Sequence, residues 1–152
     1  ANGTDAIELS LRALGVLAGD RVATTANAGM YTTTAILAIG AEPFFLDVSS
    51  ETHNVTLAEV ERAITSGVHS VVVTHLFGLA AQEIQEIATL CMKHGVQLLE
   101  DCAQAHFATY KGKRVGTAGA TRGEVGYQGE VAQLEQVARY PEIPIVLLDL
   151  VA

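Results

Sequence analysis

The chain alternates between stretches whose apolar residues recur every three or four positions and short, continuous apolar runs. The first pattern predicts amphipathic helices, and the second predicts strands that are buried on both faces. The clearest helical stretch carries Ile84, Ile87, Ala88 and Cys91 on one face and is followed by Gly95. Helices are expected over residues 5–14, 28–39 and 81–94 and from a capping box at 56–59, and strands over 21–25, 44–48, 71–73 and 96–100.

This regular alternation of strand and helix predicts an α/β fold, a three-layer domain with a mostly parallel sheet. Its crossover connections should be right-handed. In such sheets ligands bind at the carboxyl ends of the strands and at helix N-termini. Candidate site residues are therefore those that directly follow a strand or begin a helix.

The pattern changes after about Gly119, which divides the chain into a core over 1–119 and a tail over 120–152. The tail begins with a Gly-rich, polar stretch. A helix is expected over 131–139, and a very apolar strand over 145–151 after the break at 141–144. The residues of the tail give no indication of its role.

Composition excludes several classes of function. The 152 residues carry a formal net charge of −8, and the run from Lys111 to Arg114 is the only basic cluster, so a nucleic-acid partner is not expected. No apolar run reaches transmembrane length, so no membrane association is expected, and the cytoplasm is the expected compartment. Cys91 and Cys102 have neither a disulfide framework nor zinc spacing, which predicts buried thiols and no metal site.

Two polar segments fall where the fold would place a ligand. Asn2 to Asp5 opens the first helix, where Gly3 lets a ligand approach the backbone and unpaired N–H groups bind phosphate; plain N-capping is the alternative. Asp101 ends the apolar run 96–100, and its carboxylate could hold a protonated ring nitrogen by a charge-assisted hydrogen bond. An acid that merely caps the following turn is the alternative there, and Gln104 could equally be a surface residue.

Taken together, the ordered motifs resemble the DegT/DnrJ/StrS family, the pyridoxal-phosphate-dependent sugar aminotransferases of fold type I. The matching stretches are 2–6, 26–28, 40–48, 75–78, 100–106 and 110–117. The resemblance runs from Asn2 to about Gly119, and it implies an incomplete large domain of that fold without the family's C-terminal domain.

The resemblance implies roles for individual residues. Gly3, Thr4 and Asp5 would form the phosphate loop, mostly through backbone N–H groups. Asp101 would pair with the pyridine nitrogen, and Gln104 would lie beside the ring oxygen. The implied cofactor is pyridoxal phosphate or pyridoxamine phosphate.

The family also places an aromatic residue against the ring face, early in the helix that follows the Asn27 motif. The ungapped register puts Gly29 there, with Met30 and Tyr31 next. Met30 is the predicted cofactor contact.

The Schiff-base lysine of the family has no counterpart in this chain, whose lysines are Lys93, Lys111 and Lys113. We therefore expect no catalytic residue and a cofactor that binds, if at all, non-covalently. The leading hypothesis is a truncated or diverged relative of a nucleotide-sugar aminotransferase that does not transaminate on its own.

Two alternatives stay open at this point. One is a non-catalytic module for oligomerisation or ligand binding that keeps the fold, and the other is an unrelated nucleotide-binding α/β domain. A nucleotide sugar is the ligand class that the family implies. A homo-oligomer, most simply a dimer, is expected because half of a sheet domain and the apolar run 145–151 would expose apolar surface.

Overall fold

The computed structural model describes residues 2–118 and 145–147. Its helices are α1 (Gly3–Ala13), α2 (Met30–Ala38), α3 (Leu57–Thr65) and α4 (Ile84–His94), with a short 3₁₀ turn at Leu76–Gly78. Its strands are β1 (Arg21–Thr25), β2 (Glu42–Leu46), β3 (Ser70–Thr74), β4 (Gln97–Asp101), β5 (Thr109–Tyr110), β6 (Lys113–Arg114) and β7 (Ile145–Leu147).

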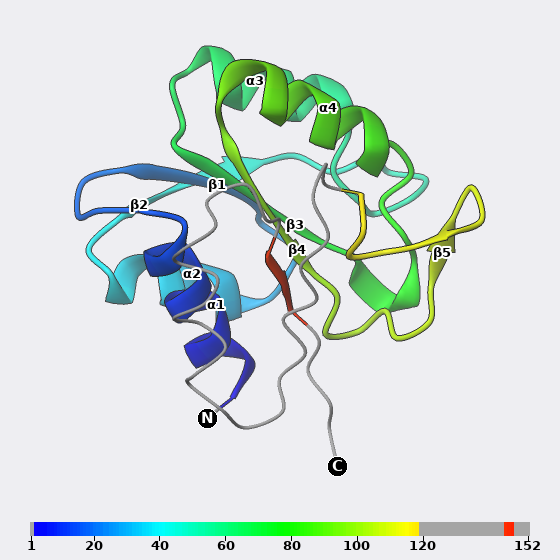
Figure 1. Ribbon diagram of the computed structural model, residues 1–152, viewed down its shortest axis with the longest axis horizontal. Coiled ribbons are helices and arrows are strands. Elements are labelled where there is room, and N and C mark those ends of the chain that lie inside the picture. The colour runs from blue at the N-terminus through cyan, green and yellow to red at the C-terminus, as the bar shows by residue number, and fades with distance from the viewer. Residues whose placement is uncertain (1, 119–144, 148–152) are drawn as a thin grey trace.

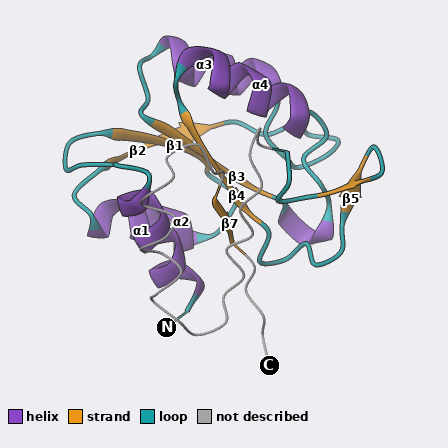
Figure 2. Cartoon of the chain, viewed as in Figure 1, coloured by secondary structure: helices purple, strands orange, loops and turns teal. Residues whose placement is uncertain are grey.

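One parallel sheet forms the middle layer, in the order β2-β1-β3-β4-β7. Helices α1 and α2 cover one face, and α3 and α4 cover the other (Figures 1 and 2). The separate β5–β6 hairpin is antiparallel. The predicted three-layer α/β fold with a parallel sheet is confirmed.

Local rules explain where the helices begin and end. Thr56 caps α3 by accepting a hydrogen bond from the Glu59 N–H at 3.4 Å, as the capping box predicts. Gly95 ends α4 in the left-handed conformation, with φ of 66°. Helix α2 begins at Met30 rather than at residue 28, because Gly29 has φ of 70°, which lies outside the α-helical range.

Strand β2 begins two residues earlier than the apolar run 44–48 predicts. It includes Pro43, which pairs with Val22 of β1. Proline is tolerated there because β2 lies at the edge of the sheet, where one side of the strand needs no ladder hydrogen bond.

The core is split into two layers by the sheet. Val71 and Val73 of β3 face the cluster beneath α3 and α4, whereas Val72 faces the cluster beneath α1 and α2. On β4 the same alternation sends Leu98 to the first cluster and Leu99 to the second. The two acids that follow on β4 therefore point to opposite faces of the sheet.

Strand β7 pairs with the carboxyl half of β4, with Ile145 opposite Leu99 and Leu147 opposite Asp101. The helix expected over 131–139 lies outside the described residues, and the division of the chain at residue 119 stays a prediction.

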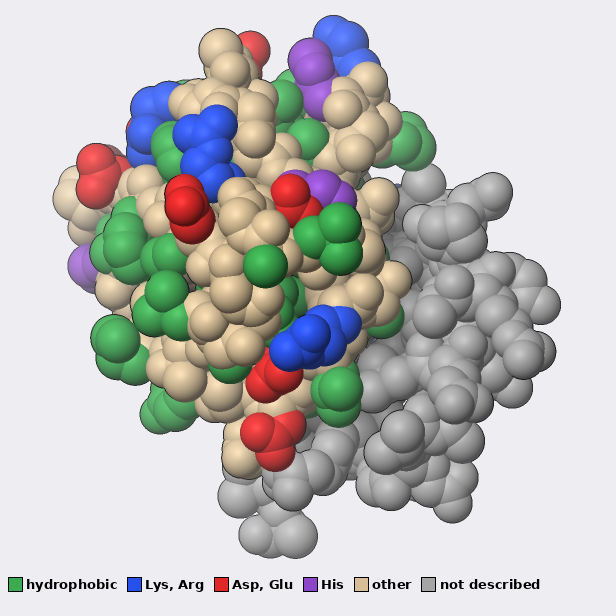
Figure 3. All heavy atoms as spheres, turned by 90° about the vertical axis from the view of Figure 1, so that its left-hand side faces the viewer, with side chains coloured by type: hydrophobic (Ala, Val, Ile, Leu, Met, Phe, Trp, Pro, Cys, Tyr) green, Lys and Arg blue, Asp and Glu red, His purple; other side chains and the backbone are tan. Residues whose placement is uncertain are grey.

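On the face shown in Figure 3, acidic and basic side chains of the described residues are interspersed, without an extended basic area. None of the described helices combines the length and apolarity that crossing a membrane would require.

Candidate functional site

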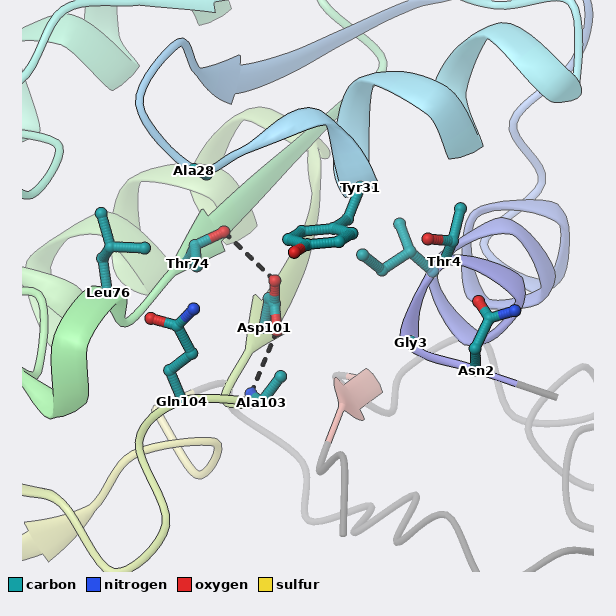
Figure 4. A pocket seen from close by; sticks show the side chains of 11 residues that line it. Asn2, Gly3, Thr4, Ala28, Tyr31, Thr74, Leu76, Asp101, Ala103 and Gln104 are labelled. Atoms are coloured by element: carbon teal, nitrogen blue, oxygen red, sulfur yellow. Dashed lines mark hydrogen bonds between the residues drawn. The ribbon is translucent and has the colours of Figure 1, made fainter. Parts of the chain in front are cut away.

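A cavity of about 380 Å³ lies at the carboxyl edge of the sheet, on the side of α1 and α2 (Figure 4). Four of the six predicted site residues line it, namely Gly3, Thr4, Asp101 and Gln104. The other lining residues are Asn2, Ile7, Ala28, Tyr31, Thr74, Leu76 and Ala103. The cavity therefore joins the start of α1, the start of α2 and the ends of β3 and β4.

Asp101 forms the floor of this cavity and is only 7% exposed. Its Oδ2 accepts a hydrogen bond from Thr74 Oγ1 at 3.3 Å, and its Oδ1 accepts one from the Ala103 N–H at 3.1 Å. These two donors come from the end of β3 and from the turn after β4, so they fix the plane of the carboxylate. The result is an oriented acidic group at the bottom of a pocket.

The N-terminus of α1 forms a second wall. Asn2 caps the helix, since its Oδ1 accepts from the Asp5 N–H at 3.1 Å. The first i→i−4 hydrogen bond of α1 runs from the Ala6 N–H to the Asn2 carbonyl, so the N–H groups of Gly3 and Thr4 precede the intrahelical ladder. Capping by Asn2 therefore does not use the N–H groups of Gly3 and Thr4, so N-capping and anion binding are compatible at this helix start.

Asp5 does not line the cavity. Its N–H donates to Asn2 Oδ1, and its carboxylate accepts from Asn2 Nδ2 at 3.2 Å. Because the N–H of Asp5 is engaged in capping, the N–H groups at the start of α1 that could meet a ligand in the cavity are those of Gly3 and Thr4.

The structure brings Tyr31, and not Met30, to the cavity. Met30 is 68% exposed and is absent from the lining, whereas the Tyr31 ring lies above Asp101 (Figure 4). Consecutive residues of a helix point about 100° apart, so Met30 and Tyr31 leave the first turn of α2 in different directions. The Tyr31 ring also folds back over Gly29, where an added Cβ would come within 3.0 Å of Tyr31 Cε2.

Gln104 reaches the cavity from the turn that follows β4. Its Oε1 accepts a hydrogen bond from the Phe77 N–H at 3.0 Å.

Thr74 and Leu76 were not identified as site residues from the sequence, although both follow the β-branched run 71–73 at a strand end. That position was the signal that could have found them.

A second polar cluster lies on the opposite face of the sheet, around Glu100. This residue is 1% exposed, and its carboxylate accepts from the Gly116 N–H at 2.8 Å and the Ala118 N–H at 3.2 Å. His75, which is fully buried, places Nε2 at 3.0 Å from Glu100 Oε2. Since His75 Nδ1 accepts from the Ala81 N–H, the ring proton is on Nε2 and is donated to Glu100.

The same cluster includes Cys102, and three potential ligand atoms of His75, Glu100 and Cys102 lie within 4.8 Å of one another. The protonated Nε2 of His75 has no lone pair to offer a metal ion. Burial, followed by the nearby Glu100 and Asp101 carboxylates, raises the pKa of the Cys102 thiol. The donor set therefore fits an internal hydrogen-bond cluster better than a metal centre.

The three lysines of the chain lie away from the cavity. Lys93 lines a groove between α3 and α4, on the other side of the sheet. Lys111 pairs with Glu86 at 2.8 Å at the surface, and Lys113 is exposed. No lysine of the described part of the chain lines the cavity.

Comparisons with known proteins agree with this geometry. The chain is 42% identical over 118 residues to a pleiotropic regulatory protein of Geobacillus stearothermophilus, covering 78% of this chain and 32% of that protein. It is 41% identical over 119 residues to UDP-N-acetyl-3-dehydro-alpha-D-glucosamine 3-aminotransferase of Acidithiobacillus ferrooxidans, with coverages of 78% and 32%. The aminotransferase structure from Psychrobacter cryohalolentis matches with a TM-score of 0.71 and 39% identity, over 76% of this chain and 29% of that one.

The chain thus spans about a third of the length of the curated relatives that it matches. The model of the DegT/DnrJ/EryC1/StrS aminotransferase family, which is pyridoxal-phosphate-dependent, matches residues 1–123. An unrelated nucleotide-binding domain is thereby excluded. The chain belongs to the DegT/DnrJ/EryC1/StrS aminotransferase family.

Proposed function

We propose that residues 2–118 form the cofactor-binding part of a sugar aminotransferase and hold pyridoxal phosphate or pyridoxamine phosphate without a covalent bond. One observation carries the proposal: an oriented, nearly buried carboxylate, Asp101, shares a cavity with the N-terminus of α1. A ligand with a cationic ring nitrogen at one end and a phosphate at the other matches both groups at once. The cavity of about 380 Å³ is within the size range of cofactor sites.

The chemical groups that line the cavity, as well as their positions, suit this ligand. Gly3 and Thr4 offer backbone N–H groups at a helix start, which favour a phosphate. Asp101 would hold a proton on the ring nitrogen, and Thr74 and Ala103 keep its carboxylate in position for that bond. Tyr31 would cover one face of the ring and exclude water. When bound, the cofactor supplies an electron sink for chemistry at the carbon next to the substrate nitrogen.

The substrate class follows from the relatives rather than from the cavity. Several of them are named as aminotransferases of nucleotide sugars or of related cyclic ketones. We propose that the complete enzyme to which this fold belongs transfers an amino group to a keto-sugar. Since no lysine lines the cavity, transamination by this chain alone is not expected.

Borohydride trapping tests the non-covalent character of the binding. The purified chain is titrated with pyridoxal phosphate, followed by absorbance, then reduced with borohydride and weighed by mass spectrometry. The proposal predicts saturable binding without a stoichiometric covalent adduct. A stoichiometric adduct on Lys111 or Lys113 would overturn it, as would a chain that does not bind the cofactor at all.

A non-catalytic ligand-binding module is the second candidate, and the distance of all three lysines from the cavity favours it. One relative is named as a pleiotropic regulatory protein. The two candidates differ in their response to an amino donor. A working half-reaction converts bound pyridoxal phosphate to the pyridoxamine form, and a binding module leaves its spectrum unchanged.

Self-association is a further part of the proposal. Large apolar side chains are exposed near the cavity and in nearby loops, including Tyr31, Phe77 and Phe107. Such surface is covered in many proteins by a second copy. Light scattering at micromolar concentration should show a dimer, and a second run on a chain cut after Arg139 reports whether the tail takes part. A monodisperse monomer would remove this part of the proposal.

A further inference from the structure

The turn between β3 and α4 has an unusual backbone that the cofactor proposal does not use. Phe77 has φ of 56°, a left-handed conformation that bulky residues rarely adopt. Its side chain is 72% exposed, so packing of the ring does not explain the conformation. What the conformation does provide is the direction of the Phe77 N–H, which donates to Gln104 Oε1 at 3.0 Å.

That single hydrogen bond decides which end of the Gln104 amide faces the cavity. A backbone N–H can only donate, so its partner must be the oxygen of the amide. With Oε1 engaged by Phe77, Nε2 lies on the side of Asp101 and Thr74 (Figure 4). Gln104 therefore presents hydrogen-bond donors, and not an acceptor, to a ligand.

The turn itself is held from inside the protein. The His75 N–H donates to the Asp101 carbonyl at 3.0 Å, and the His75 ring accepts from the Ala81 N–H at 3.0 Å. Between these two anchors the Leu79 N–H donates to the Leu76 carbonyl at 3.0 Å. Glu100 fixes the other side of the His75 ring, so both ends of the turn are tied to β4.

The contact between the turn and Gln104 is also close at the backbone. Gly78 has φ of 78°, and an added Cβ would lie 3.5 Å from the Gln104 carbonyl oxygen. The turn and the loop after β4 are therefore neighbours at this point.

We propose that the turn from His75 to Ala81 is a positioning device, which holds the Gln104 amide with its donor towards the cavity and so selects a ligand with an acceptor atom there. His75 and Phe77 are positioning residues, because they act on the ligand through Gln104. The inference rests on the proposed function only in the choice of pyridoxal phosphate as the probe.

Amide exchange of the labelled chain without ligand tests the turn directly. Exchange of the Phe77 N–H should become about tenfold faster in Gln104→Leu, which removes the acceptor. It should stay as in the unaltered chain in Gln104→Glu, which keeps an acceptor, and in the surface control Gln82→Leu. Equal Phe77 exchange in the unaltered chain and in Gln104→Leu would overturn the proposal.

His75→Gln tests the anchor. A glutamine keeps a donor for Glu100 but removes the ring acceptor of the Ala81 N–H. Phe77 exchange should accelerate by a similar factor, while exchange of the core amides of Val72 and Leu99 stays unchanged. If exchange of all three amides accelerates together, His75 has a purely structural role and is not a positioning residue of the turn.

Titration with pyridoxal phosphate tests selection at the cavity. Gln104→Glu turns an acceptor towards the ligand and should weaken binding by about tenfold. The surface control Gln82→Leu should bind as the unaltered chain does. Equal affinities of Gln104→Glu and the unaltered chain would overturn the selection. If the chain binds no pyridoxal phosphate, the proposed function is wrong. The amide-exchange experiment then tests by itself whether the turn holds the Gln104 side chain.

Discussion

Glu100 and Asp101 are neighbouring acids at the end of the same strand, yet they lie in different surroundings. Glu100 points to the face of α3 and α4, is 1% exposed, and accepts from His75, Gly116 and Ala118. Asp101 points to the face of α1 and α2 and lines the cavity. The donors to Glu100 come from the protein interior, whereas those to Asp101 leave the carboxylate at the floor of a pocket.

The difference teaches that the side of the sheet, rather than the residue type, decides whether an acid is enclosed by protein donors or lines the cavity. A strand sends successive side chains to opposite faces, so a shift of one residue along β4 exchanges these two surroundings. Glu100 joins β4 to the turn after β3 and to residues 116–118, and we expect it to contribute to stability. Asp101 lines the cavity, and we expect its substitution to be felt mainly in binding.

The largest effect on stability is expected for Glu100→Gln. The amide would turn a donor towards groups that are themselves donors, and the free energy of unfolding should fall by about 3 kcal/mol. Asp101→Asn should lower it by about 1 kcal/mol or less. Urea unfolding at neutral pH measures both. Equal losses in the two variants would remove the contrast between the two acids.

The pH dependence of stability tests the surroundings of the two acids, because the buried thiol of Cys102 lies beside both of them. Its folded pKa is raised, so the folded thiol stays protonated while the unfolded thiol ionises above about pH 8.5. Stability contributed by this group is complete below that pH and is lost as the pH rises. The loss should be about 1.4 kcal/mol per pH unit. Cys102→Ala should lose stability less steeply between pH 8 and pH 10, and parallel curves would contradict the assignment.

Gly29→Ala tests the wall of the cavity opposite Asp101. With φ of 70° and ψ of −177°, Gly29 has a backbone conformation that is essentially confined to glycine, so an alanine there should cost about 1–3 kcal/mol of stability. The added Cβ should also displace the Tyr31 ring and weaken cofactor binding. Gly19→Ala is the matched control, since Gly19 has φ of 86° and no atom within 4 Å of its added Cβ. Both variants should lose stability in urea, and only Gly29→Ala should bind pyridoxal phosphate more weakly.

The smallest effect is expected for Thr74→Val, which removes one donor to Asp101 without changing the size of the side chain. Cofactor affinity should fall a few-fold, about 0.5–1 kcal/mol. Thr89→Val on α4 is the control, because its hydroxyl donates only to the Gln85 carbonyl on the other side of the sheet. An unchanged affinity of Thr74→Val would show that the Thr74 hydroxyl is not needed to orient Asp101.

The sequence predicted the parts of the fold that local patterns determine. The strand over 71–73 and the helix start at Thr56 are each determined by a few neighbouring residues, and both predictions are confirmed. Helix α4 was placed three residues too early, because residues 81–84 form a turn closed by the Ile84 N–H and the Ala81 carbonyl, and the first i→i−4 hydrogen bond runs from Ile87 to Glu83.

The site was predicted where it depends on strand ends and helix starts, and less well where it depends on side-chain direction. Asp101, Gly3 and Thr4 lie at such ends and line the cavity. Tyr31 and Met30 differ by one helical step, which the register of a motif does not resolve. The role of Glu100 was missed because two of its partners, Gly116 and Ala118, follow it by 16 and 18 residues.

The affinity of the folded chain for pyridoxal phosphate, compared between the unaltered protein and Asp101→Asn, tests the central claim most directly. Asp101 is proposed to hold the charged ring nitrogen, so the variant should bind at least about tenfold more weakly while its unfolding curve stays close to that of the unaltered chain. Equal affinities in two folded proteins, or no binding by the unaltered chain, would contradict the account.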